Sequence, residues 1–67
     1  MKLSLKSARI NKDLSRPDVI KLLAEKDIKI TVNTLASYEN KTTQPNVTTA
    51  LALASIYGVD VDNLIFL

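Results

Sequence analysis

Near the middle of the chain the sequence reads Thr31-Val32-Asn33-Thr34-Leu35-Ala36-Ser37-Tyr38-Glu39-Asn40-Lys41. Thr31 is a favourable helix N-cap, and Ile30 and Leu35 stand at the two positions of a hydrophobic staple. These signals predict a helix over about residues 32–39. The predicted helix carries no charged residue before Glu39 and presents small polar side chains instead.

A second helix start lies upstream, at Ser15-Arg16-Pro17-Asp18. Ser15 offers a capping hydroxyl, Pro17 lies in the first turn where its missing N–H does no harm, and Asp18 completes a capping box. The apolar spacing that follows predicts a helix over about residues 16–26. An earlier helix is predicted over about residues 2–11.

Downstream of the quoted stretch, polar residues predict a loop, and a helix follows over about residues 46–57. Gly58 is expected to end this helix because glycine readily adopts the left-handed conformation found at helix C-termini. The apolar pattern predicts that five side chains of this helix point inward, namely Val47, Ala50, Leu51, Ala54 and Tyr57.

A last short helix is predicted over about residues 61–66, with Asp60 as its cap. The periodicity is helical throughout, and no alternating strand pattern is present. The sequence therefore predicts an all-α fold of five short helices with brief connections, forming one domain over residues 1–67.

The composition argues for binding and against catalysis. The chain has 67 residues, a net charge of +2, and neither Cys nor His. These absences exclude disulfides and thiol nucleophiles, make a zinc site implausible and remove the commonest general base. We therefore expect a protein that is not an enzyme and that uses no metal and no cofactor.

The charges are unevenly distributed along the chain. Residues 1–30 carry eight Lys or Arg and four Asp or Glu, whereas residues 31–67 carry one basic and three acidic side chains. A basic half suits a polyanion such as nucleic acid. The alternative interpretation is an ordinary solvated helix surface.

The sequence shows no targeting or membrane signal. Its start lacks the apolar central region and the cleavage site of a signal peptide. The most apolar tract, residues 50–59, is half the length of a membrane span. We expect a cytoplasmic protein, associated with the nucleoid through DNA, with no membrane partner and no small-molecule ligand.

The uncharged helix over residues 32–39 has the chemistry of a helix that enters the major groove of DNA. Such a helix reads base edges with its first turn, while neighbouring groups hold phosphates. Asn can bond the edge of adenine in a bidentate manner, Ser and Thr are tolerant readers, and a Val methyl can pack on a thymine methyl.

At this point the sequence resembles a known family. Residues 31–41, followed by Pro45, resemble the recognition-helix region of the Cro and lambda-repressor-like helix-turn-helix regulators. Arg9, the Leu14-Ser15 pair and the ending over residues 56–64 match the same family in the same order. The resemblance covers about residues 5–66, and the tail further resembles small regulators of Gram-positive bacteria and their phages.

The resemblance implies a helix-turn-helix formed by the second and third helices, and it assigns roles to individual residues. It also implies that Arg9 and Glu39 form a structural ion pair. The base-facing residues would be Val32, Asn33 and Ser37, with Thr31 and Thr34 as secondary contacts. The phosphate contacts would be Arg16, Asn40, Lys41, Thr42 and Thr43. For Asn33, Ser37 and Val32 the alternative is an exposed helix position without a DNA contact.

The sequence departs from the family pattern in three places. Lys41 and Asp13 each stand where the family has Gly. Between Leu23 and Thr31 seven residues intervene where the family has two. We interpret the excess as one added turn of the second helix plus a longer loop, which leaves open whether Lys26 and Lys29 contact phosphates.

Together these features predict a sequence-specific regulator that binds a palindromic double-stranded operator as a homodimer and represses by occluding a promoter. The dimer interface is predicted in the apolar tail, which consists of Leu64, Ile65, Phe66 and Leu67. The alternative is a protein-interaction module on the same fold, an antirepressor or antitoxin-like subunit that binds DNA weakly.

Overall fold

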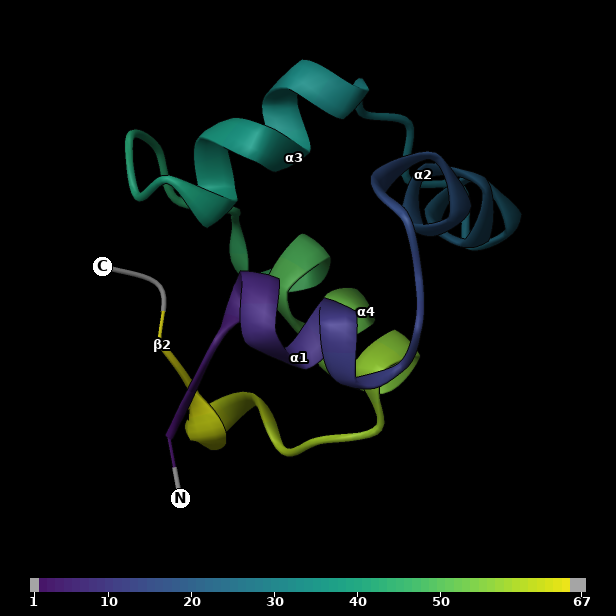
Figure 1. The fold of residues 1–67 in the computed structure, drawn as a ribbon. Helices are drawn as coiled ribbons and strands as arrows, with labels where there is room; N and C mark the ends of the chain where they lie inside the picture. Colours follow the sequence, from purple (N-terminus) through teal and green to yellow (C-terminus); the bar gives the residue numbers. More distant parts are fainter. Residues whose placement is uncertain (1, 66–67) are drawn as a thin grey trace.

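The structure, a computed structural model, describes residues 2–65 and is mostly helical (Figure 1). The α-helix α2 packs against α3 and α4, and α1, which lies in front of α4 in this view, packs against α3 (Figure 1). The helices are α1 (Leu5–Asn11), α2 (Arg16–Glu25), α3 (Val32–Glu39) and α4 (Val47–Tyr57). The remaining elements are β1 (Leu3–Ser4), the 3₁₀ turn η1 (Val61–Asn63) and β2 (Leu64–Ile65).

Each α-helix begins at a side chain that accepts a hydrogen bond from a backbone N–H in the first turn. The predicted caps Ser15 and Thr31 are confirmed, and Ser15 forms the predicted capping box with Asp18. Hydrogen bonds from the Ser15 backbone N–H and side chain lower the pKa of Asp18. Ser4 and Asn46 cap the other two helices. Because these two residues are caps, α1 begins at residue 5 and α4 at residue 47, later than predicted.

Each of the four α-helices is followed, within two residues of its end, by a residue with left-handed backbone. These residues are Asp13 (φ 56°), Asp27 (φ 63°), Lys41 (φ 64°) and Gly58 (φ 68°). The predicted stop at Gly58 is therefore confirmed, while the other three helices place a residue with a Cβ in this conformation. The two positions where the family has Gly, 13 and 41, keep the left-handed turn without it.

The core lies where the four helices meet. Leu35 of α3 and Leu23 of α2 are completely buried, and so is Leu53 of α4. Ile30 packs against this core just before α3, as the staple predicts. The other buried apolar side chains among the described residues are Leu5, Ala8, Val19, Ala54, Tyr57 and Leu64.

The predicted inward side of α4 is correct for Ala54 and Tyr57, which are buried, and wrong for Val47 and Leu51. Val47 is 75% exposed and Leu51 is 52% exposed, whereas Thr49 and Leu53 face the core. The cause is the composition of α4, Val-Thr-Thr-Ala-Leu-Ala-Leu-Ala-Ser-Ile-Tyr, which is apolar on nearly every side. Without a polar face, the periodicity does not determine which side is buried.

The predicted fifth helix is also wrong. Residues 61–63 form only a 3₁₀ turn, and Asp60 precedes it without a capping hydrogen bond from its side chain. The chain then becomes extended, and β2 pairs in parallel with β1, in the register Leu3↔Leu64 and Ser4↔Ile65. In this extended conformation Leu64 is buried in the core and pairs with Leu3. A helix continued through Leu64 would prevent this pairing.

The connection from α2 to α3 is longer than one turn of a helix. α2 ends at Glu25, so two of residues 24–30 are helical and five form the loop. The added helical turn is therefore only partly present, and most of the extra length is loop.

None of the helices in the described part of the chain has the length and apolar character needed to cross a bilayer.

Candidate nucleic-acid interface

The N-terminal end of α3 presents uncharged side chains to the solvent. Thr31, Val32 and Asn33 are exposed, and Val32 exposes 39% of its surface although it is apolar. Ser37 lies one helical turn beyond Asn33 and is half-buried. Because residues four apart share a helix face, Asn33 and Ser37 form one polar strip along α3.

The two threonines at this end hold one another in place. The Thr34 N–H donates to Thr31 Oγ1 over 3.1 Å, and the two hydroxyl oxygens are 3.0 Å apart. This pairing occupies part of their hydrogen-bonding capacity inside the cap. Thr34 is also half-buried, so Asn33 is the most available polar reader among the residues predicted to face bases.

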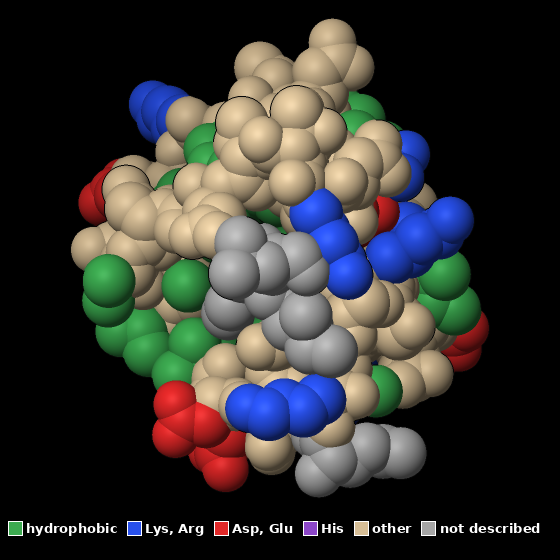
Figure 2. All heavy atoms as spheres, turned by 90° about the vertical axis from the view of Figure 1, so that its left-hand side faces the viewer, with side chains coloured by type: hydrophobic (Ala, Val, Ile, Leu, Met, Phe, Trp, Pro, Cys, Tyr) green, Lys and Arg blue, Asp and Glu red, His purple; other side chains and the backbone are tan. Residues whose placement is uncertain are grey.

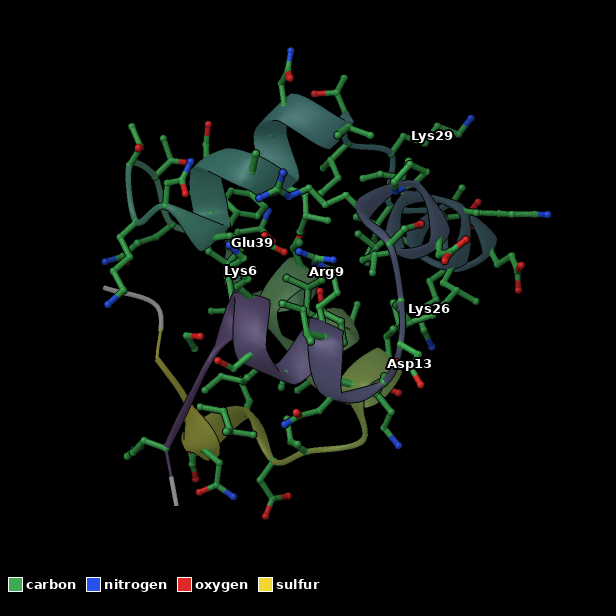
Figure 3. All side chains as sticks on the ribbon, in the orientation of Figure 1. Lys6, Arg9, Asp13, Lys26, Lys29 and Glu39 are labelled. Carbon is green, nitrogen blue, oxygen red and sulfur yellow. The ribbon has the colours of Figure 1, made fainter. Side chains whose placement is uncertain are left out.

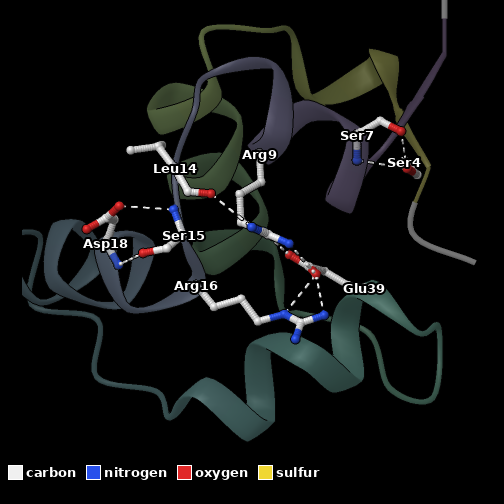
Figure 4. Close-up of polar contacts among 8 residues, drawn as sticks. All are labelled: Ser4, Ser7, Arg9, Leu14, Ser15, Arg16, Asp18 and Glu39. Atoms are coloured by element: carbon white, nitrogen blue, oxygen red, sulfur yellow. Dashed lines mark hydrogen bonds and ion pairs between the residues drawn. The ribbon is translucent and has the colours of Figure 1, made fainter.

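The C-terminal end of α3 is built around a buried carboxylate (Figure 4). The Glu39 side chain is fully buried, and Arg9 Nε donates to its Oε2 over 2.7 Å. Arg9 Nη1 also donates to the Leu14 carbonyl oxygen over 2.9 Å. The structure thus brings together the ion pair implied by the family, and one guanidinium joins α1, the turn after α1 and α3.

A second arginine shares the same carboxylate. Arg16, the first residue of α2, places Nε and Nη2 each 3.0 Å from Glu39 Oε1. The sequence predicts only a phosphate role for Arg16 and misses this contact, because nothing local links positions 16 and 39. One third of the Arg16 side chain stays exposed, and two guanidinium groups on one carboxylate leave a net positive charge at this corner.

The carboxylate also affects two neighbouring groups. Hydrogen bonding to Glu39 raises the pKa of Arg9 above its already high usual value. Burial raises the pKa of the Tyr57 hydroxyl, and the charge of Glu39 acts in the same direction. Among the described residues the Tyr57 hydroxyl has no hydrogen-bond partner. Both residues therefore keep one protonation state throughout the neutral pH range.

The loop after α3 carries the other predicted phosphate contacts. Asn40, Lys41, Thr42 and Thr43 are all exposed, and the Thr42 N–H donates to the Ser37 carbonyl over 3.0 Å. Seen from the left of Figure 1, two groups of Lys and Arg side chains lie near the middle of the molecular face, and the acidic groups lie mostly toward its edges (Figure 2).

Of the predicted dimer interface, the structure describes the side chain of Leu64 alone. Leu64 is 5% exposed and belongs to the core of its own chain, so it is not available to a partner. Ile65 lies in β2, and Phe66 and Leu67 fall outside the described residues. Among the described residues, the large apolar side chains that are exposed are Ile10, Val32, Val47 and Leu51.

Comparison with known proteins agrees with this arrangement. A family model described as helix-turn-helix, of the Cro and C1 type, matches residues 5–64, which is nearly the whole chain. The chain belongs to this helix-turn-helix family. Searches of curated proteins and of solved structures find no match.

The family membership gives the geometry a function at the level of class. The protein is a DNA-binding helix-turn-helix domain of the kind that regulates transcription. In this helix-turn-helix protein, α2 and α3 are the two helices of the motif, and α3 holds the position of the recognition helix.

Proposed function

We propose that the protein is a sequence-specific repressor that inserts α3 into the major groove of double-stranded DNA. The observation that carries this proposal is the exposed and uncharged first turn of α3, fixed by the Thr31 cap. A base-reading surface needs hydrogen-bonding groups or methyl groups that are free to meet base edges. The exposed side chains of Val32 and Asn33 supply both kinds.

Within this proposal each exposed residue of α3 contacts a different part of the base edges in the groove. Asn33 makes the bidentate contact to the edge of adenine, for which its amide offers one donor and one acceptor. Ser37, on the same strip, bonds the next base along the groove. Val32 packs on a thymine methyl, and Thr31 and Thr34 make secondary contacts.

Phosphates would be held near the C-terminal end of this strip. Arg16 uses the exposed part of its guanidinium, whose orientation is set by the two bonds to Glu39. Beyond the C-terminal end of α3, the exposed loop provides Asn40, Lys41, Thr42 and Thr43. Such contacts fix the register of the protein on the duplex and carry no sequence information themselves.

We further propose that two copies bind a palindromic operator, with half-sites about 10 base pairs apart. The operator symmetry would mirror the symmetry of the dimer. Sedimentation of the wild type beside Phe66→Glu tests the tail as the dimer contact. Loss of the dimer in the variant supports it, and an unchanged dimer assigns the contact to another surface.

The decisive experiment is a selection of random duplexes with the wild type, Asn33→Ala and the control variant Asn11→Ala, whose asparagine is exposed on α1 away from α3. We expect the wild type and Asn11→Ala to enrich the same palindrome. Asn33→Ala should enrich a relaxed version of it. Absence of enrichment by the wild type at every salt concentration would contradict the proposal.

A further inference from the structure

The long turn between α2 and α3 has a defined structure. The Asp27 N–H donates to the Ala24 carbonyl over 3.0 Å, and the Ile28 N–H donates to the Leu23 carbonyl over 3.0 Å. With Asp27 in the left-handed conformation, these bonds form a Schellman closure of α2. The backbone that follows Asp27 therefore leaves α2 in one fixed direction.

The three residues after the closure alternate between the core and the solvent. Ile28 and Ile30 are half-buried and pack against the core, while Lys29 between them is exposed. Two anchored neighbours in an extended segment direct the side chain between them outward. The acidic residues of this turn, Glu25 and Asp27, are exposed, and neither forms an ion pair with Lys29 within the described residues.

The two lysines of the turn point to different sides of the molecule. In Figure 3 Lys29 extends outward beside the N-terminal end of α3, whereas Lys26 extends toward the opposite end, on the side of Asp13. Lys29 stands two residues before the Thr31 cap, so it lies directly beside the base-reading end of α3. The turn thus delivers one cation to the DNA-facing side and keeps the other away from it.

We propose that Lys29 is a phosphate contact which the lengthened turn adds to the DNA interface, at the N-terminal flank of α3. The proposal rests on the proposed function, since it takes α3 to lie in the major groove. A groove that holds α3 is bordered by sugar–phosphate backbone beyond both helix ends. Arg16 and the loop after α3 supply cations near the C-terminal end of α3. Lys29 supplies one at the N-terminal end, which otherwise carries only uncharged side chains.

The test compares Lys29→Ala with Lys26→Ala, a matched control from the same turn with the same change in charge. The dissociation constant of each variant and of the wild type is measured by fluorescence anisotropy over a series of salt concentrations. The DNA is the duplex that the wild type enriches in the selection described above. We expect Lys29→Ala to weaken binding and to reduce the slope of log K against log salt by about 0.9, the value for one phosphate contact. Lys26→Ala should keep the wild-type slope, and Lys29→Arg should restore it.

Each other outcome has a definite meaning. If the wild type binds the duplex and the two alanine variants give equal slopes, the proposal for Lys29 is overturned while the proposed function stands. If the wild type binds no duplex at any salt concentration, the proposed function fails and the proposal for Lys29 fails with it. Thermal unfolding of all variants, which should be unchanged for exposed lysines, shows that the slopes compare folded proteins.

Discussion

The two ends of α3 are built in opposite ways. At the N-terminal end, Val32 and Asn33 are exposed, and the side-chain hydrogen bonds found there among the described residues are those of the Thr31 cap. At the C-terminal end, Glu39 is fully buried and holds guanidinium groups from α1 and α2. One end of the helix can therefore change its side chains without disturbing the fold, and the other cannot. We expect stability and sequence preference to respond to substitutions at different ends.

The largest expected effect is that of Glu39→Ala. Removing the carboxylate leaves two guanidinium groups partly buried without a counter-charge, which costs about 3–5 kcal/mol of unfolding free energy. Chemical denaturation followed by circular dichroism measures this loss. Glu25→Ala, at an exposed glutamate of α2, is the control and should change stability by less than about 0.5 kcal/mol. Equal effects of the two substitutions would refute the anchoring role of Glu39.

Asn33→Ala should have the reverse profile. We expect its unfolding free energy to stay within about 0.5 kcal/mol of the wild type, because Asn33 is exposed and has no partner in the described structure. Discrimination between the selected operator and a duplex with one changed base pair should fall by about 1–3 kcal/mol. Competition binding with the two duplexes measures it. A variant that loses stability but keeps its discrimination would reverse the roles of the two helix ends.

Thr31→Ala tests whether the reading end depends on its cap. Loss of the hydroxyl removes the bond to the Thr34 N–H and should cost about 1 kcal/mol. Thr31→Ser keeps the hydroxyl and should retain most of the stability. Thermal unfolding of the three proteins provides the comparison. If the serine variant is as unstable as the alanine variant, then the methyl group of Thr31, and not its hydrogen bond, supports this end.

The smallest effect is expected at Lys41, directly after the anchored end. Lys41 adopts a left-handed backbone at φ 64°, which is strained for a residue with a Cβ. Lys41→Gly removes this strain but adds conformational entropy to the unfolded chain. We expect the balance to raise the free energy of unfolding by about 0.5 kcal/mol. Lys41→Ala removes the same charge and keeps the strain, so it should not be stabilised. The midpoints of urea unfolding report both values. A lower midpoint for the glycine variant would show that the strain at this position is negligible.

The features that follow from the sequence are those set by neighbours three or four residues apart. The caps at Ser15 and Thr31 join a side chain to a backbone N–H three residues on, so the sequence displays both partners. The bounds of α3 agree with the prediction for this reason. The left-handed residue at Gly58 is likewise a local signal.

The features that do not follow are set by distant parts of the chain. Arg16 reaches Glu39 across 23 positions, and no short-range pattern marks that meeting. The exposed side of α4 depends on where the other helices pack, since its own sequence has no polar face. The base-facing roles of α3 remain predictions from the family, because geometry places Asn33 and Ser37 on one strip without showing what they touch.

The pairing of β1 with β2 has a consequence for the order of folding. It joins residues 3–4 to residues 64–65, so the whole intervening chain must close as a loop before the contact can form. Closing a long loop costs more conformational entropy than forming a local helix, whose contacts are close in sequence. We expect this pairing to form last and to open first, so its amides should exchange with deuterium earlier than those of α3. Exchange at residues 3–4 and 64–65 would then report on the last step of folding, apart from the formation of the helices.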